Sequence, residues 1–287
     1  MRECEEAQRL LDYSNCKINF LSPLFEIKPC KLIEPLLQTQ ELIMSLPKIA
    51  LVTGGSKGIG AAIVRRLSTD GFAVAVNYSK NPAPADDLVT ELKDAGYTAL
   101  AICCDVANSD AVSQMFDTIE SELGPVNVLI NNAGIMKNAP VAQSEEQDFD
   151  QQIAVNLKGT FNTLKQAANR MPNGGRIVNL STSVVGLKLE QYGIYAATKS
   201  AVETMSAILS KELRGRDITV NAIAPGPTAT DLFLDGKSQE LIDRLAKMSP
   251  LERLGTPDDI ARAVAFLVSP DGAWINGQVL RANGGIV

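Results

Sequence analysis

The 287-residue chain contains no histidine, and this absence limits its possible chemistry more than any other feature of its composition. Ser-His-Asp triads, histidine-activated cysteines and most protein metal sites all depend on an imidazole ring. We therefore predict no metal site. Any acid–base catalysis must come from tyrosine, lysine, aspartate or glutamate.

Other scarcities exclude classes of partner. There are 27 lysines and arginines against 33 aspartates and glutamates, and the net charge of −6 disfavours binding to nucleic acid or to an anionic membrane. No apolar run approaches the roughly 20 residues that span a bilayer. The five cysteines show no metal-ligand spacing, and the adjacent Cys103 and Cys104 lie in a predicted strand. We therefore expect reduced thiols and a cytoplasmic protein.

Residues 1–43 differ in character from the rest and are predicted to be an N-terminal extension of a catalytic domain at 44–287. Pro23, Pro29 and Pro35 interrupt any long helix. Acidic residues near the start argue against a signal or transit peptide. We hypothesise that Met44 is the natural start, or that the extension packs loosely. A native protein whose mass includes Met1 would disprove a start at Met44.

From Lys48 onward, strand-like and helix-like segments alternate, which predicts one α/β domain with a Rossmann-type, doubly wound parallel sheet of about seven strands. Helices are expected between the strands, for example over 111–123 and 149–170. The predicted strands are 49–52, 72–76, 99–103, 126–130, 177–180, 218–224 and 279–280.

A glycine-rich turn connects the first predicted strand to the first predicted helix. Its glycines let the backbone bend sharply, and the helix N-terminus that follows attracts anions through free N–H groups and its dipole. We expect it to bind the pyrophosphate of a dinucleotide, although this motif alone could be an ordinary strand–turn–helix. The expected contacts are Thr53, Gly54, Ser56, Lys57, Gly58, Ile59 and Gly60.

The end of the second strand indicates which dinucleotide is bound. Enzymes that use NAD usually place a carboxylate there to bind the adenosine ribose. This chain instead has Asn77, Tyr78, Ser79 and Lys80, with no acid before Asp86. Because a carboxylate would repel a 2′-phosphate whereas serine and lysine would not, we predict NADP(H) over NAD. The alternative is that the lysines, including that of the glycine turn, simply coat the surface.

Three later strand ends supply further candidates for cofactor binding. Asp105 could accept a hydrogen bond from adenine or cap the next helix. The polar turns after the fourth and sixth strands could contact the cofactor closely, the latter at the nicotinamide amide. The complete set of candidates here is Asp105, Val106, Asn132, Ala133, Gly134, Pro225, Gly226, Thr228 and Thr230.

The chemistry is expected where the fifth strand ends, in Ser181-Thr182-Ser183, and on the following helix. Tyr195 and Lys199 are four residues apart and share one helix face. An ammonium near a phenol favours the phenolate and lowers a pKa that is ordinarily near 10. A bare Tyr-x-x-x-Lys is usually an unremarkable amphipathic helix, but its place after the serines and the glycine turn favours a catalytic pair.

Together these motifs, in their order and spacing, resemble the short-chain dehydrogenase/reductase family over residues 48–287. The resemblance implies that Tyr195 donates a proton to a substrate carbonyl and that Lys199 lowers the pKa of Tyr195 and binds the nicotinamide ribose. It also implies that Ser183 orients the carbonyl oxygen and that Asn156 extends a proton relay through water. Ser181 is the rival for the serine role. Ser183 is preferred because an apolar pair and a glycine follow it.

The resemblance further implies an NADPH-dependent oxidoreductase that reduces a small aldehyde or ketone and forms a homodimer or homotetramer. Residues 215–287 are similar to plant and bacterial members described as aldehyde or 3-oxoacyl reductases. The alternatives are a 3-oxoacyl-thioester reductase, a sugar or alcohol dehydrogenase, an enoyl reductase, an epimerase and a non-catalytic dinucleotide-binding regulator. We expect a lid over 231–248, with an apolar substrate wall of Leu232, Phe233, Leu234 and Leu241.

Overall fold

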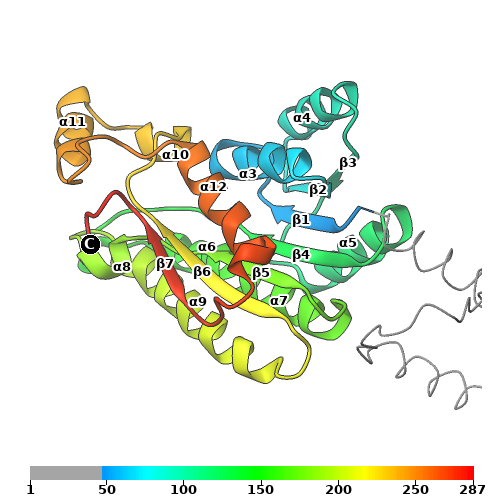
Figure 1. Cartoon of the computed structure of the whole chain (residues 1–287). Helices are drawn as coiled ribbons and strands as arrows, with labels where there is room; N and C mark the ends of the chain where they lie inside the picture. Colours follow the sequence, from blue (N-terminus) through cyan, green and yellow to red (C-terminus); the bar gives the residue numbers. More distant parts are fainter. Residues whose placement is uncertain (1–46) are drawn as a thin grey trace, which may run out of the picture. The chain divides into compact units, whose positions relative to one another are not determined.

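The computed structural model describes residues 47–287, so the predictions about the 1–43 extension and Met44 lie outside the described residues. The described chain forms one seven-stranded sheet in the order β3-β2-β1-β4-β5-β6-β7, and every neighbouring pair is parallel (Figure 1). This confirms the predicted fold class. The strands are β1 Ile49–Thr53, β2 Ala73–Tyr78, β3 Ala99–Cys103, β4 Val126–Asn131, β5 Arg176–Leu180, β6 Thr219–Pro225 and β7 Val279–Ala282.

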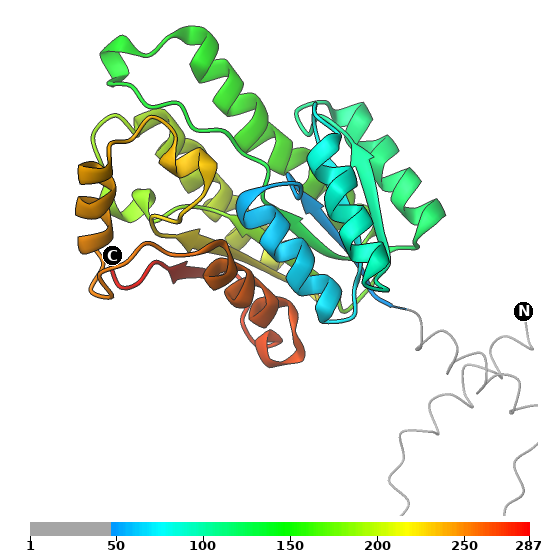
Figure 2. The same ribbon diagram turned by 90° about the horizontal axis from the view of Figure 1, so that it is seen from above.

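Helices cover both faces of the sheet (Figure 2). On one face lie α3 Gly58–Thr69, α4 Ala83–Asp94 and α12 Pro257–Val268, and on the other lie α5 Ser109–Glu122, α7 Gly159–Arg170 and α9 Gly193–Glu212. The shorter helices are α6 Glu146–Gln152, α8 Val184–Leu187, α10 Asp231–Leu234 and α11 Gln239–Lys247. No helix within 47–287 is both long and apolar enough to span a membrane.

The two covered faces explain why the central strands have continuous apolar runs. Side chains alternate across a strand, so Ala50 and Val52 of β1 face the α3 side while Ile49 and Leu51 face the α5 side. All five residues of β1 are buried. A strand buried on both faces has no need of polar residues at alternate positions.

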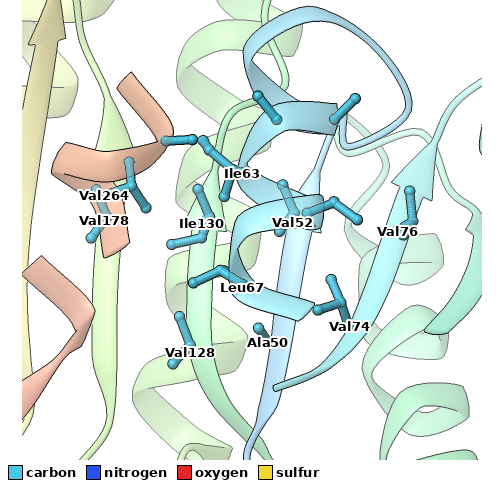
Figure 3. Packing of buried hydrophobic residues seen from close by; sticks show 14 of the residues in the cluster. Ala50, Val52, Ile63, Leu67, Val74, Val76, Val128, Ile130, Val178 and Val264 are labelled. Carbon is cyan, nitrogen blue, oxygen red and sulfur yellow. The ribbon is translucent and has the colours of Figure 1, made fainter. Parts of the chain in front are cut away.

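The core beneath α3 is built from small and branched side chains. Figure 3 shows Ile63 and Leu67 of α3 against Val52 of β1 and Ile130 of β4, with Val264 of α12 beside them. Ile63 and Leu67 are fully buried. This packing fixes α3 against the sheet and therefore fixes the glycine turn that precedes it.

The predicted helix over 149–170 is wrong in one respect, because it is divided. Its middle, Ile153–Lys158, is π-helical and separates α6 from α7. The Asn156 side chain is fully buried there and bonds to both backbone groups of Ile135. Single π turns usually occur where a side chain needs a special position. Apolar periodicity does not reveal such a change in the winding of a helix.

The strand order reverses at β1, which has β2 on one side and β4 on the other. The chain that leaves β1 continues on one face of the sheet, and the chain that leaves β4 continues on the other. The two connections therefore separate at the carboxyl ends of β1 and β4. In open α/β sheets ligands bind in the crevice at this switch point. The glycine turn and the residues after β4 meet there.

Truncation of Ile63 to alanine should lower the free energy of unfolding by about 2–5 kcal/mol, because it leaves a cavity among fully buried neighbours. The same change at Ile208, which is 50% exposed on α9, is the matched control and should cost less than about 1 kcal/mol. Urea denaturation followed by circular dichroism measures both. Equal losses would contradict the described packing of α3.

Candidate active site

A cleft opens at the carboxyl ends of the central strands, between α9 and the segment that carries α10 and α11. It brings together residues predicted separately for catalysis and for cofactor binding. These are Ile59, Asn132, Gly134, Ser183, Tyr195, Lys199, Pro225, Gly226, Thr228 and Thr230. Within residues 47–287 no group of three or more histidine, cysteine, aspartate or glutamate side chains is arranged to hold a metal ion.

Lys199 is almost completely buried at 4% exposure, one helical turn from Tyr195 on α9. Its Nζ donates a 2.7 Å hydrogen bond to the carbonyl oxygen of Leu180 at the end of β5 and lies 5.9 Å from the centre of the Tyr195 ring. Burial disfavours the ammonium and lowers the pKa of Lys199 to about 8. The cation therefore sits in a position where its charge is costly, between the catalytic tyrosine candidate and the strand ends.

The pKa of Tyr195 lies above that of free tyrosine, so the lowering predicted from Lys199 is not the dominant effect among the chain's own groups. Desolvation of the Tyr195 hydroxyl raises the pKa of Tyr195 to about 12, although part of this side chain is exposed. A hydrogen bond from Thr182 acts in the opposite sense, and the neighbouring Tyr192 adds to the rise. Because the Lys199 ammonium points to Leu180, its attraction for the phenolate does not offset the loss of water.

Asn156 uses its side chain to hold the loop after β4. Its Oδ1 accepts from the Ile135 N–H at 2.8 Å, and its Nδ2 donates to the Ile135 carbonyl at 2.9 Å. A Cβ on Gly134 would lie 3.3 Å from Asn156 Oδ1 and 3.5 Å from Lys199 Nζ. The π turn therefore brings Asn156 close to Lys199, and the Asn156 amide is hydrogen-bonded to the loop after β4.

The Ser183 hydroxyl lines the cleft and makes two hydrogen bonds within the chain. It donates to the Ala224 carbonyl at 3.1 Å and accepts from Asn283 Nδ2 at 2.9 Å. The role of Ser183 in orienting a substrate carbonyl stays a prediction. The rival Ser181 donates to Glu203 at 2.6 Å. The sequence shows three consecutive hydroxyls but not their directions, which depend on the turn that follows β5.

The glycine turn delivers an uncapped helix N-terminus to the crevice. Lys57, the N-cap residue of α3, makes no capping hydrogen bond with its side chain. Gly54 and Gly58 have φ values of +59° and +52°, which glycine adopts readily. The free N–H groups of the first turn fit the negatively charged pyrophosphate of a dinucleotide.

Three polar residues predicted to contact the cofactor hold this turn from inside. Thr53 Oγ1 accepts from the N–H groups of Asn132 and Ala133. Asn77 Oδ1 accepts from the Gly54 N–H at 3.2 Å, and its Nδ2 donates to the carbonyls of Ile102 and Cys104. Asn132 Nδ2 likewise donates to the carbonyls of Thr53 and Gly54. These amides join the ends of β1–β4, a structural use that their positions in the sequence do not distinguish from ligand binding.

The residues predicted for the adenosine end are mostly accessible. Ser79, Lys57 and Lys80 are exposed, and Tyr78 is half-buried. Asp105 is exposed too, and its Oδ1 accepts from the Ala107 N–H at 3.0 Å. The helix-capping alternative for Asp105 is wrong, because Asn108 caps α5.

Val106 is buried rather than open to a ligand. Its carbonyl accepts from Asn162, and its side chain fills the space beside Gly159, where a Cβ would approach Val106 Cγ2 to 2.6 Å. This contact holds the start of α7 against the end of β3. The contact of Val106 with a cofactor stays a prediction.

The other end of the cleft is bounded by the segment after β6. Thr230 caps α10 by accepting from the Phe233 N–H, and its methyl group lies where a Cβ on Gly58 would meet it at 3.3 Å. Leu232 and Phe233 line the cleft as predicted, whereas Leu234 and Leu241 do not. Sequence reasoning missed several further lining residues, among them Met136, Val184, Leu187, Leu189, Tyr192 and Ile286. Their apolar character gave no signal that separates them from core residues.

A doubly wound sheet, an anion-binding turn at its switch point and a tyrosine–lysine pair in the adjoining cleft define a dinucleotide-dependent oxidoreductase. Residues 54–287 match the family model described as enoyl-(acyl carrier protein) reductase. The chain is 42% identical over 250 residues to a short-chain type dehydrogenase/reductase of Picea abies, covering 84% of this chain and 92% of that one. It belongs to the short-chain dehydrogenase/reductase family.

Other relatives indicate the range of activities near this chain. It is 41% identical to an NADPH-dependent aldehyde reductase-like protein of Arabidopsis thaliana, covering 84% of this chain and 94% of the relative. It is 40% identical to the 3-oxoacyl-[acyl-carrier-protein] reductase FabG of Staphylococcus aureus, covering 85% and 99%.

Solved structures agree with the assignment. A short-chain dehydrogenase/reductase from Serratia marcescens superposes with a TM-score of 0.80 at 34% identity, over 84% of this chain and 98% of that one. A short chain dehydrogenase from Burkholderia cenocepacia, solved in complex with NADP, gives 0.79 at 35% identity with the same coverage.

Gly60→Ala should weaken NADPH binding at least tenfold, because its Cβ would lie 2.2 Å from the Gly54 carbonyl oxygen and 2.6 Å from Asn132 Nδ2. Relief of these contacts requires the turn to move. Fluorescence titration with NADPH measures the effect. Gly96→Ala is the control: it has a φ of +87° but open space around it, so it should cost stability without changing affinity. Unchanged affinity in Gly60→Ala would contradict the description of the turn.

Proposed function

We propose that this chain reduces small aldehydes or ketones with NADPH, and that Tyr195 is the proton donor. The observation that supports the proposal is the Tyr195–Lys199 pair in one cleft with the glycine turn and the end of β6. Bound NADPH supplies the hydride that reduces the carbonyl carbon. The chain's own residues must then position the substrate and deliver a proton to its oxygen.

The pKa of Tyr195 is raised and that of Lys199 is lowered, which suits a tyrosine that donates the proton and a lysine that assists it. With a pKa of about 12, Tyr195 keeps its proton at neutral pH and holds it until a basic oxygen develops in the cleft. Lys199, with a pKa of about 8, is mostly charged at neutral pH. Its ammonium stabilises the phenolate left by proton transfer and can donate to a ribose hydroxyl. We keep Asn156 as the residue that extends the proton path from Lys199 through water.

The walls of the cleft favour a substrate with modest apolar groups. Met136, Leu187, Phe233 and Met248 contribute apolar surface, and Lys199 is the one lysine or arginine among the lining residues. A highly charged substrate would find few partners there. The likeness to FabG supports a 3-oxoacyl thioester as the second candidate, and the description of the family model supports an enoyl thioester less directly.

Assembly and location are further proposals. Phe161 on α7 and Ile208 on α9 are each 50% exposed, and Trp274 is 99% exposed, so apolar surface is available for a homodimer or homotetramer. We retain a cytoplasmic location from the free thiols of Cys103 and Cys104 and from the acidic charge, while two Arabidopsis relatives are described as chloroplastic. Residues 44–287 are proposed to form the catalytic domain.

Tyr195→Phe should reduce the turnover number at least a hundredfold, since the ring stays and only the transferable proton is lost. Consumption of NADPH with a panel of aldehydes, diketones and 3-oxoacyl thioesters measures it. NADPH affinity should be unchanged, because the hydroxyl does not hold the cofactor turn. Nucleotide binding without turnover by the wild-type protein on the whole panel would favour the non-catalytic regulator.

Replacing both Lys57 and Lys80 with glutamine should lower kcat/KM for NADPH about tenfold and leave the value for NADH nearly unchanged, because only NADPH carries the 2′-phosphate. Lys93→Gln, an exposed lysine at the end of α4, is the charge-matched control. Steady-state kinetics at low ionic strength with both cofactors measures the selectivity. A parallel loss with NADH would show that these lysines do not read the phosphate.

A further inference from the structure

The loop after β4 forms one wall of the cleft, which Ile135 and Met136 line. Three alternate residues of this loop each have an acceptor for the backbone N–H group, as alternate residues of an extended strand do. The three bonds run from Ile135 to Asn156 Oδ1 at 2.8 Å, from Lys137 to Gln152 Oε1 at 3.2 Å and from Ala139 to the Gln191 carbonyl at 3.0 Å. Two side-chain amides and one carbonyl therefore take the place of a partner strand.

Gln152 is the last residue of α6, and it is completely buried. It lies four residues before Asn156, so the two amides reach the loop from the same face of their segment. Asn156 uses both halves of its amide on Ile135. Gln152 uses only its oxygen, because within residues 47–287 its Nε2 has no hydrogen-bond partner.

The unpaired Nε2 indicates what Gln152 contributes. A buried amide donor without a partner destabilises the folded chain, and a leucine of similar volume would fill the same space without that loss. Filling the core therefore does not require an amide at this position. The contribution of Gln152 is its acceptor oxygen, which holds the N–H of Lys137. Lys137 is itself exposed, so without this acceptor its N–H would bond to water.

We propose that Gln152 is a positioning residue that holds Met136 in the cleft wall and thereby lowers the KM for short-chain carbonyl substrates, an inference that rests on the proposed reductase function. The Lys137 N–H belongs to the peptide that joins it to Met136, so the bond to Gln152 fixes the backbone beside this side chain. When the acceptor is lost, the N–H turns to water and Met136 moves outward with it. A short substrate then loses an apolar contact, whereas a longer one still reaches Leu187 and Met248 on other parts of the wall.

The bond to Gln152 acts on substrate binding and not on proton transfer. Asn156 holds Ile135 independently, and a Cβ on the preceding Gly134 would lie 3.5 Å from Lys199 Nζ. The part of the loop next to the Lys199 ammonium therefore stays in place when the bond at Lys137 is lost. Loss of a contact that substrate and transition state share raises KM and leaves kcat unchanged.

The test compares Gln152→Leu with the wild-type enzyme on butanal and octanal at saturating NADPH. The KM for butanal should rise about fivefold to tenfold, while the KM for octanal and both kcat values stay within about twofold. The thermal midpoint should be unchanged or higher, because the unpaired donor is removed with the amide. Gln151→Leu, at an exposed position of α6, is the matched control and should change none of these values.

A double-mutant cycle shows whether Gln152 acts through Met136. Met136→Ala should by itself raise the KM for butanal about as much as Gln152→Leu does, and the double variant should show no further rise. Effects that multiply in the double variant would overturn the proposal. An unchanged KM for butanal in folded Gln152→Leu, or a tenfold fall in kcat for both aldehydes, would overturn it too. A Gln152→Leu protein that does not fold would show that the amide serves the fold itself, with the same consequence.

Amide hydrogen exchange separates failure of this proposal from failure of the proposed function. In Gln152→Leu the Lys137 amide should exchange at least tenfold faster than in the wild type, while the Ile135 amide keeps its rate. An unchanged rate at Lys137 would refute the role of the Gln152 oxygen. Wild-type inactivity on every carbonyl, with exchange at Lys137 accelerated in the variant, would refute the reductase function and the effect on KM but keep the Gln152–Lys137 contact.

Discussion

The burial of a single ammonium group, that of Lys199, is the constraint on which the rest of the site depends. A cation with 4% exposure persists only where oxygen atoms replace water, and the Leu180 carbonyl at the end of β5 is one such atom. The Asn156 amide reaches the same neighbourhood from a π turn, and the absence of a side chain at Gly134 leaves room for it, because a Cβ there would lie 3.3 Å from Asn156 Oδ1. The end of β5, the loop after β4 that contains Gly134 and the π turn that contains Asn156 therefore meet around the Lys199 ammonium.

The lack of histidine gives this arrangement its importance. Most enzymes that move protons near neutral pH rely on a side chain that titrates there unaided. In this chain burial instead shifts the pKa values of two side chains: that of Tyr195 rises to about 12 and that of Lys199 falls to about 8. Free tyrosine and lysine have similar pKa values, that of lysine being slightly the higher. Here the order is reversed, because the pKa of Tyr195, about 12, lies well above that of Lys199, about 8. An enzyme of this kind depends on the exclusion of water from its cleft for its acid–base chemistry.

Much of the fold could be predicted from the sequence, because the alternation of apolar runs and helical periods carries it. The positions of the strand ends that form the crevice could be predicted in the same way. Side-chain direction at those ends did not: Asn77 and Thr53 face inward to backbone groups, and Ser183 faces Ala224, although all three sit at positions typical of ligand contacts. After the last ladder hydrogen bond the chain turns, and the alternation rule no longer says where a side chain points. The π turn at Asn156 was hidden for a similar reason, since apolar spacing barely changes when one turn widens.

The switch point between β1 and β4 also has a consequence for how the chain acquires its shape. Leu51 pairs with Ala75 of β2 nearby in the sequence, but it pairs with Leu129 of β4 only across a much longer loop. Closing the longer loop costs more entropy and slows folding. The β1–β3 half can therefore associate before β4 docks, and the crevice exists only after that docking. A dinucleotide cannot serve as a template for the early steps; it can only trap the chain once both halves of the sheet have met.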